Sequence, residues 1–170
     1  MSARWVLVTG GAARLGREFC LAFARAGWDV VCHYRHSATE AAQTCADVRA
    51  LSRQAHAVQA DLGQSGAVAR LFDEVLAAIG RAPDALVNNA SQFEPDSDAQ
   101  ARLTPELLTA LLQVNLAAPL QLAGLLARAR AAGGRGDDAC AIHVLDQKVF
   151  NLNPDYFSYT VTKLALERAV

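Results

Sequence analysis

Residues 4–16 read RWVLVTGGAARLG, an apolar run that passes directly into a cluster of glycines. Arg4–Val8 has the length of a buried strand, and a helical pattern starts at Leu15. Glycine lets the backbone turn sharply and approach a pyrophosphate, and the helix amino terminus offers free N–H groups at its positive dipole end. Because the glycines lie between a strand and a helix, the stretch predicts a dinucleotide site, with an ordinary tight turn as the alternative.

Apolar runs of strand length alternate with amphipathic segments of helix length along the rest of the chain. Strands are expected at Arg4–Val8, Asp29–Tyr34, His56–Ala60, Ala85–Asn88 and Ala139–Leu145, and helices at Leu15–Ala26, Thr39–Ser52, Gln64–Ile79, Pro105–Ala131 and from near Pro154 to the end of the sequence. This alternation predicts an α/β fold with a doubly wound parallel sheet and helices on both faces. The 170 residues fit a single domain, residues 1–170.

Composition excludes several classes of protein. The 16 basic and 17 acidic residues are interspersed, so no basic cluster indicates binding to nucleic acid or to an anionic membrane. No apolar run is expected to approach the roughly 18 residues of a membrane span. The amino terminus has no signal-peptide anatomy, which predicts a cytoplasmic location. The four cysteines have no CxxC spacing, so we expect buried free thiols, no disulfide and no metal site.

The end of the second predicted strand distinguishes between two dinucleotides. An NAD site usually has an acidic residue there, which binds the ribose hydroxyls. This chain instead reads HYRHS over residues 33–37. Arg35, His36 and Ser37 can donate hydrogen bonds to a 2′-phosphate, and Arg14 would add positive charge nearby. The pattern favours NADPH over NADH, with a solvated basic turn as the alternative.

Polar residues also follow the third and fourth predicted strands. Asp61, which precedes Leu62, can accept a hydrogen bond from an adenine amine, or it can cap the helix that follows. The segment at 88–90, Asn-Asn-Ala, offers small side chains beside the expected cofactor, so that the backbone can lie against a flat ring.

A proline interrupts the long predicted helix. Pro119 lies four residues after Asn115. Because proline has no N–H, the carbonyl of Asn115 loses its helical partner. That carbonyl can hold a water molecule, or the proline can simply bend the helix to fit the sheet, and the spacing does not separate the two interpretations.

A second group of reactive residues lies in HVLDQKVFNLNPDYFSYTVTK, residues 143–163. Tyr159 and Lys163 are four residues apart, which places them on one face of a helix. The ammonium group favours the phenolate and is expected to lower the pKa of the tyrosine, so that the pair can pass a proton near neutral pH. Asp146 follows an apolar run and is expected to point into the crevice where open α/β sheets bind ligands. A solvated helix face is the alternative for the pair alone.

Together these motifs resemble the short-chain dehydrogenase/reductase family. The matching pieces are TGGAARLG at 9–16, ADL at 60–62, NNA at 88–90, Asn115 and YTVTK at 159–163, which occur in the family's order and cover nearly the whole chain. The resemblance implies a Rossmann-type sheet and an active-site set of asparagine, serine, tyrosine and lysine. Asn115, Tyr159 and Lys163 match this set, whereas Asp146 stands in place of the serine.

The aspartate is similar to that of the pteridine reductase branch of the family. Arg14 in the first turn, HYRHS at 33–37 and NNASQF at 88–93 also resemble that branch, although Arg35 and His36 are interchanged relative to its order. The resemblance implies hydride transfer from NADPH to a C=N bond of a pteridine, such as a dihydropterin or a dihydrofolate-like molecule.

The resemblance also implies a role for each site residue. Tyr159, with Asp146 beside it, would supply the proton, Lys163 would hold the nicotinamide ribose, and Asn115 would hold a relay water. Ser91 would hydrogen-bond the substrate and Phe93 would stack on it. The full cofactor set is Gly10, Arg14, Leu15, Gly16, Tyr34, Arg35, His36, Ser37, Asp61, Leu62, Asn89, Ala90 and Lys163, and the substrate set is Arg14, Ser91, Phe93, Asp146 and Tyr159.

Two other functions stay open. One is reduction of another carbonyl substrate, such as a 3-oxoacyl thioester, and the other is a nucleotide-binding module without catalysis. Family members are usually longer and carry a substrate-covering loop that this sequence lacks. Either the sequence is part of a longer protein, or its carboxyl-terminal region is truncated, which would leave the last predicted strand as an exposed edge. Family members commonly associate through the long helix and the last helix, which implies a homotetramer.

Overall fold

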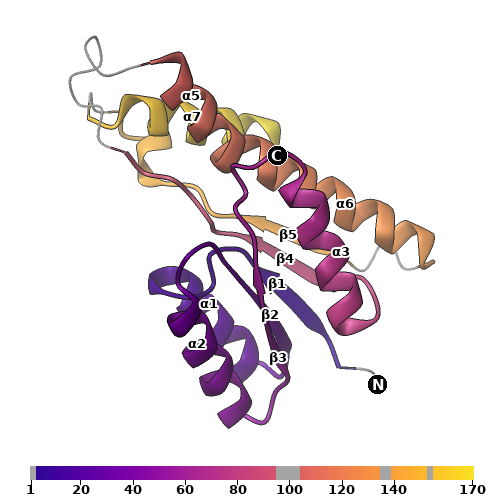
Figure 1. The fold of residues 1–170 in the computed structure, drawn as a ribbon. Coiled ribbons are helices and arrows are strands. Elements are labelled where there is room, and N and C mark those ends of the chain that lie inside the picture. The colour runs from indigo at the N-terminus through magenta and orange to yellow at the C-terminus, as the bar shows by residue number, and fades with distance from the viewer. Residues whose placement is uncertain (1–2, 95–103, 135–138, 153–154) are drawn as a thin grey trace.

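The computed structural model describes residues 3–94, 104–134, 139–152 and 155–170. Within these residues, parallel strands form one sheet in the order β3-β2-β1-β4-β5 (Figure 1). The strands are β1 (Trp5–Val8), β2 (Asp29–Tyr34), β3 (Ala55–Gln59), β4 (Ala85–Asn88) and β5 (Cys140–His143). The helices are α1 (Arg14–Arg25), α2 (Ala38–Ala50), α3 (Ala67–Ile79), α5 (Pro105–Leu112), η1 (Gln113–Ala117), α6 (Ala118–Ala132), η3 (Gln147–Val149) and α7 (Phe157–Ala169). The strand order reverses between β1 and β4, which confirms the doubly wound fold of Rossmann type.

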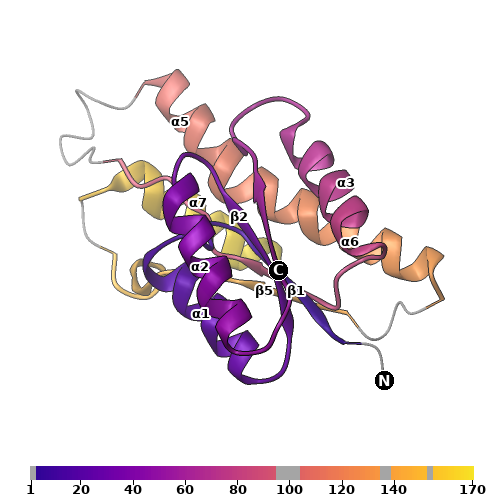
Figure 2. The ribbon, with the colours of Figure 1, turned by 60° about the horizontal axis from the view of Figure 1, so that its bottom comes forward.

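Both faces of the sheet are covered by helices. Successive side chains along a strand point to opposite faces, and here they are apolar on both faces, so each face needs a covering layer. Val6 and Val30 pack in a core cluster with Leu21 of α1. Their neighbours Leu7 and Val31 belong to the other cluster, which includes residues of α3 and α6. Figures 1 and 2 both show α1 and α2 on one side of the sheet and α3 and α6 on the other.

The long helix predicted over Pro105–Ala131 is divided by a π-helical turn. It begins as predicted, since Thr104 Oγ1 accepts a hydrogen bond from the Leu107 N–H at 3.2 Å. The π-turn η1 ends two residues before Pro119, and the Ala118 N–H donates a hydrogen bond back to the Gln113 carbonyl. Proline has no N–H to donate to the helix. The regular α-helical hydrogen bonding is therefore interrupted just before Pro119, where the sequence predicted it, and the interruption takes the form of a π-turn.

Several element ends differ from the prediction. α3 begins at Ala67 rather than at Gln64, because Gly66 before it is left-handed with φ 71°. α7 begins at Phe157, and Pro154, near which it was expected to open, lies outside the described residues. β5 is shorter than the run predicted over 139–145.

One helical stretch, Pro105–Ala132, is long and apolar enough by length and composition to cross a membrane. The expectation that no apolar segment approaches that length was therefore wrong. The stretch owes much of its apolar character to the core, since Leu122 and Leu126 are buried against the sheet. The core helix of a globular protein meets the same criterion of composition.

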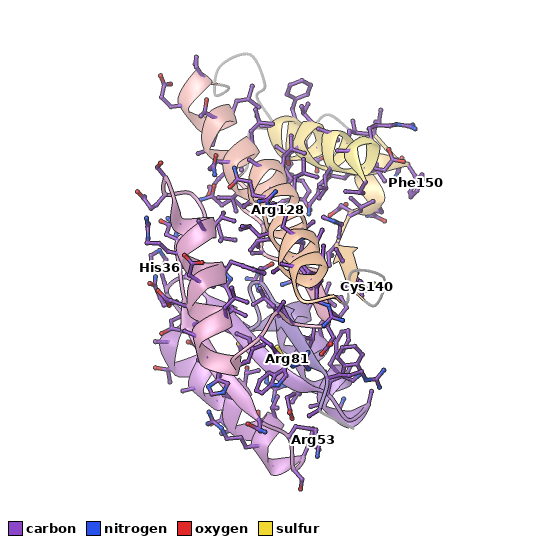
Figure 3. All side chains as sticks on the ribbon, turned by 90° about the vertical axis from the view of Figure 1, so that its right-hand side faces the viewer. His36, Arg53, Arg81, Arg128, Cys140 and Phe150 are labelled. Atoms are coloured by element: carbon purple, nitrogen blue, oxygen red, sulfur yellow. The ribbon has the colours of Figure 1, made fainter. Side chains whose placement is uncertain are left out.

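β5 forms one outer edge of the described sheet. Cys140 and Ala141 are exposed, and 40% of Ile142 is exposed. Phe150 beyond the strand is 89% exposed, and Figure 3 shows Cys140 and Phe150 at the periphery of the molecule. Cys140 departs from the prediction of buried thiols, whereas the other three cysteines are buried and free.

Candidate cofactor and active site

A cavity of about 430 Å³ opens at the carboxyl ends of β1, β2, β3 and β4. It brings together every residue of the predicted cofactor set except Lys163. The lining residues are Gly10, Ala12, Ala13, Arg14, Leu15, Gly16, Tyr34, Arg35, His36, Ser37, Asp61, Leu62, Asn89, Ala90, Ser91, Gln92 and Val114. Segments from four strand ends therefore meet at one site, as parallel strand order requires.

The glycine turn at the base of the cavity depends on two glycines. Gly10 adopts a left-handed conformation with φ 64°. A β-carbon on Gly16 would collide with the Gly10 carbonyl oxygen, so the first turn of α1 can approach the turn only because that carbon is missing. α1 has no side-chain cap and no acidic residue in its first turn. Its first N–H groups are thus available to an anion, which suits a pyrophosphate.

Arg14 starts α1 in the left-handed region, with φ 50°. This conformation costs a residue with a β-carbon roughly 1–2 kcal/mol. The guanidinium side chain is exposed and borders the cavity. A glycine would fit the backbone better, so the arginine at this position supports a role in binding rather than in folding.

Arg35, predicted to bind a 2′-phosphate, is held by a carboxylate. Its Nη2 lies 3.1 Å from Asp61 Oδ2, and Asp61 Oδ1 accepts a hydrogen bond from the Gly63 N–H at 3.0 Å. Burial opposes ionisation, but the Gly63 N–H and the Arg35 charge hold the pKa of Asp61 below its usual value. Asp61 does not cap α3, whose N-cap is Gly66, so the capping alternative was wrong.

The reactive pair is formed by Tyr159 and Asp146. The Tyr159 hydroxyl donates a hydrogen bond to Asp146 Oδ2 at 2.9 Å. The other carboxylate oxygen of Asp146 accepts from the Lys148 N–H at 2.9 Å and caps η3. Asp146 thus combines a structural contact, the cap of η3, with a contact to the phenol.

The pKa of Tyr159 shifts in the direction opposite to the prediction. Burial raises it first, and the hydrogen bond to Asp146 and the charge of that carboxylate raise it further. Lys163 Nζ is 5.7 Å from the centre of the Tyr159 ring and donates a hydrogen bond to the Val144 carbonyl at 2.7 Å. Burial lowers the pKa of Lys163. The arrangement therefore keeps the phenol protonated, as a proton donor must be.

The side chain of Asn115 in η1 forms hydrogen bonds with the segment after β4 and with α7. Its Oδ1 accepts hydrogen bonds from Ser91 Oγ at 3.0 Å and from the Gln92 N–H at 2.8 Å. Its Nδ2 donates to the Gln92 carbonyl at 2.9 Å and to Thr162 Oγ1 at 3.1 Å. The side chain is fully used inside the protein, so any contact with a relay water falls to the backbone carbonyl, and that role stays a prediction.

Aromatic side chains gather next to the pair. Phe93 stacks on Tyr156, with ring centres 3.9 Å apart and planes 14° from parallel. Phe93 also meets Tyr159 edge to face, with ring centres 4.7 Å apart. Ser91, Phe93 and Tyr159, three of the predicted substrate residues, thus lie around one point of the structure.

Sequence reasoning missed Tyr156, Thr162 and His33. Tyr156 precedes α7 in a left-handed conformation, with φ 53°. Thr162 lay inside the matched YTVTK motif, so its position beside Lys163 was a signal that could have been followed. His33 stood in the HYRHS motif, but its burial within the sheet, at 2% exposure, was not evident from spacing.

A family model described as short chain dehydrogenase matches residues 4–169. The chain belongs to this family. The solved structure of FolM alternative dihydrofolate reductase 1 from Brucella canis, complexed with NADP, is 34% identical with a TM-score of 0.87 and covers 98% of this chain and 63% of that one. The angucycline C-6 ketoreductase LanV, with bound NADP, is 29% identical with a TM-score of 0.85 and covers 98% of this chain and 64% of that one.

Curated relatives show the same family. The short chain dehydrogenase/reductase dpchG of Colletotrichum higginsianum is 36% identical over 132 residues, 75% of this chain and 47% of the relative. The chain thus spans about half the length of the curated relatives it matches. Family members use nicotinamide dinucleotides, which confirms the predicted type of cofactor. The similar proteins include both a dihydrofolate reductase and ketoreductases, so the family is confirmed and the branch is open.

Proposed function

We propose that this chain carries the cofactor site and the proton donor of an NADPH-dependent reductase that acts on a C=N bond of a pteridine. The contact between Tyr159 and Asp146, at 2.9 Å, is the observation that carries the proposal. An aspartate here distinguishes the chain from the usual serine of the family it resembles. The likeness to FolM, at 34% identity and with NADP bound in that structure, supports both the cofactor and the substrate class.

The cavity residues fit a phosphorylated dinucleotide. The open amino terminus of α1 and the close approach at Gly16 suit a pyrophosphate. His36 and Ser37 line the cavity, and residues 33–37 include no acidic residue. Arg14 adds a positive charge to the cavity. When bound, NADPH supplies the hydride.

Arg35 gives a direct test of the cofactor preference. Its guanidinium is 3.1 Å from Asp61, so binding a 2′-phosphate requires it to turn from this partner or to bridge both groups. Arg35→Ala should weaken NADPH more than NADH, which equilibrium titration measures. An unchanged ratio of the two dissociation constants would assign the contact to His36 or Arg14. Equal affinity of the wild type for both cofactors would refute the NADPH preference itself.

Proton delivery follows from the same geometry. The raised pKa of Tyr159 keeps its hydroxyl protonated, and Asp146 orients that hydroxyl by accepting its hydrogen bond. Lys163 fixes α7 to the Val144 carbonyl and holds a positive charge near the phenol ring. When the phenol gives up its proton, this charge favours the phenolate. Contact of Lys163 with the nicotinamide ribose would require it to share or leave the Val144 carbonyl.

A flat substrate ring finds an aromatic neighbour at the same place. One face of Phe93 stacks on Tyr156, but the ring is 49% exposed, so its other face offers a stacking surface beside Tyr159. Ser91 Oγ lines the cavity and donates to Asn115, which leaves its oxygen lone pairs able to accept from an amino group of the substrate. A pteridine has both the flat ring and the amino groups that these residues would bind.

The experiment that tests the proposal replaces Asp146. Asp146→Ser restores the commoner family residue and should lower pteridine turnover by roughly 10²–10⁴, the contribution of one positioned acid-base group. NADPH affinity should be kept, because Asp146 does not line the cofactor cavity. Melting temperature, NADPH affinity and turnover are measured together on the intact protein, since loss of the cap on η3 also costs stability.

Two variants serve as controls. Asp146→Asn keeps an acceptor for the Lys148 N–H, so it separates the cap from the proton chemistry. Tyr159→Phe should abolish turnover and keep the wild-type affinity for NADPH. If Asp146→Ser turns over pteridines at the wild-type rate per folded molecule, the substrate assignment is refuted.

A second function, reduction of a ketone, is favoured by the likeness to LanV, a ketoreductase with bound NADP at 29% identity. The Tyr159 hydroxyl suits a carbonyl oxygen as well as an imine nitrogen. Turnover of ketones but not of dihydropteridines by the wild type would select this alternative. NADPH binding with no turnover of either class would leave a nucleotide-binding module.

A further inference from the structure

His33, on β2, is the buried residue that contacts the glycine turn from inside the sheet. Its Nδ1 lies 3.1 Å from the Gly10 nitrogen, and its Nε2 lies 3.1 Å from the Ala60 carbonyl oxygen. The Gly10 N–H can only donate and the Ala60 carbonyl can only accept. Nδ1 therefore has to accept, and Nε2 has to carry the proton. Two fixed neighbours select a single neutral tautomer of the ring.

The neutral state of this ring is stable at physiological pH. Burial lowers the pKa of His33 to about 4, although the Ala60 carbonyl and Asp61 oppose that shift. A protonated ring would set an N–H against the Gly10 N–H. The acceptor for the turn thus persists near neutral pH.

The backbone of His33 adds a second contact to the turn. The Gly11 N–H donates to the His33 carbonyl at 2.8 Å. On its other side, the Gly10 carbonyl accepts a hydrogen bond from Asn89 Nδ2 at 3.2 Å. The peptide groups around Gly10 are therefore held from two sides. The N–H groups of Gly10 and Gly11 are used inside the protein, so phosphate contacts fall to the N–H groups that follow them in the turn and at the amino terminus of α1.

The ring of His33 joins two walls of the cofactor cavity. Gly10 lies on one wall, and Asp61, the residue after Ala60, lies on another. His33 itself does not line the cavity and sits at 2% exposure between them. A change in this ring would alter the separation of the two walls without removing any group that touches the cofactor.

We propose that His33 is a positioning residue for the dinucleotide, which sets the glycine turn against the end of β3. The inference rests on the dinucleotide site of the proposed function but not on the choice of substrate. The parts that it positions, the pyrophosphate and adenine walls, are common to NADPH and NADH. Its removal should therefore weaken both cofactors by the same factor.

Three variants test the proposal by direct titration with NADPH and NADH. His33→Phe keeps the ring volume and removes both hydrogen bonds. In His33→Asn, Oδ1 takes the place of Nδ1 and can accept a hydrogen bond from the Gly10 N–H. In His33→Gln, Nε2 can donate a hydrogen bond to the Ala60 carbonyl. We expect His33→Phe to raise both dissociation constants roughly tenfold, because it leaves a buried N–H and a buried carbonyl without partners. His33→Asn should recover more affinity than His33→Gln, since the Gly10 contact is the closer one to the phosphates.

A matched control separates positioning from general stability. Leu126→Ala removes a buried side chain of α6 that does not line the cavity, and it should lower the melting temperature while cofactor affinity stays at the wild-type value. Turnover of the His33 variants at saturating NADPH should stay within about twofold of wild type, because the Tyr159 pair is untouched.

Three results would overturn the inference. The first is wild-type affinity for NADPH in a folded His33→Phe variant or, if that variant does not fold, in both the Asn and Gln variants. The second is a change in the ratio of the dissociation constants for NADPH and NADH, which would show that the variant acts on the 2′-phosphate contact. The third is an equal loss of affinity in Leu126→Ala. Failure of the wild type to turn over pteridines while it still binds NADPH would count against the proposed substrate alone.

Discussion

Replacing Thr162 by valine should uncouple Asn115 from α7 with little change in shape. Thr162 Oγ1 donates to the Tyr159 carbonyl at 2.7 Å and accepts from Asn115 Nδ2 at 3.1 Å. Thr162 is fully buried and Asn115 is 1% exposed, so water cannot easily replace the lost hydroxyl. Valine fills the same volume but offers no oxygen. One N–H of the Asn115 amide is then left without a partner.

The size of the effect follows from that unpaired group. A buried donor without an acceptor costs about 1–3 kcal/mol, so we expect the free energy of unfolding to fall by about 2 kcal/mol. Asn115 also holds Ser91 and the backbone of Gln92, next to the stacking surface of Phe93. Looser placement of these groups should lower turnover roughly tenfold. NADPH affinity should be nearly unchanged, since Thr162 does not line the cavity.

The assay compares wild type, Thr162→Val and Thr162→Ser. Urea unfolding gives the stability, turnover at saturating substrate gives the rate, and NADPH titration gives the cofactor affinity. Serine keeps the hydroxyl and should recover most of both losses. A valine variant with wild-type stability and turnover would show that Asn115 does not depend on Thr162, and the argument would be refuted.

Three further outcomes are expected. Gly16→Ala should abolish NADPH binding, measured by titration of the folded protein, because its β-carbon would collide with the Gly10 carbonyl and force α1 away from the turn. Arg14→Gly should leave the melting temperature unchanged or raised, since φ is 50° there, while NADPH titration shows weaker binding. The pKa of His33 is lowered by burial from 6.5 to about 4, so the unfolded chain binds more protons and stability is lost as pH falls through that window. Urea unfolding should show a loss of about 2 kcal/mol between pH 7 and pH 5, and His33→Phe should remove this slope.

The sequence allowed the fold and the cofactor cavity to be predicted well, for a physical reason. Strands buried on both faces leave continuous apolar runs, and the chain carries one at Asp29–Tyr34 whose ends match β2 without error. The turn at Gly10 and Gly16 is local in sequence, so its chemistry could be read directly. Residues at the ends of parallel strands then meet in space by topology alone.

The parts that were not predicted depend on contacts between distant segments. The direction of the Tyr159 pKa shift reverses because burial and Asp146 outweigh Lys163, and burial is not visible in spacing. The ion pair between Arg35 and Asp61 joins the ends of two strands through side-chain rotamers that the sequence does not specify. A π-turn before Pro119 is one of several ways to satisfy a helix that lacks one donor.

The cofactor cavity ends at Val114 in sequence, whereas the reactive pair comes from Asp146 and Tyr159. Mutations after β5 can therefore alter the surroundings of the reactive pair without changing any residue that lines the cofactor cavity. Evolution can explore new substrates in this part of the gene without losing the reductant. The similar proteins fit such a history, because a dihydrofolate reductase and an angucycline ketoreductase have both been crystallised with NADP. For protein engineering, the positions after residue 140 other than Asp146, Tyr159 and Lys163 are accordingly the ones to randomise when a new substrate is sought.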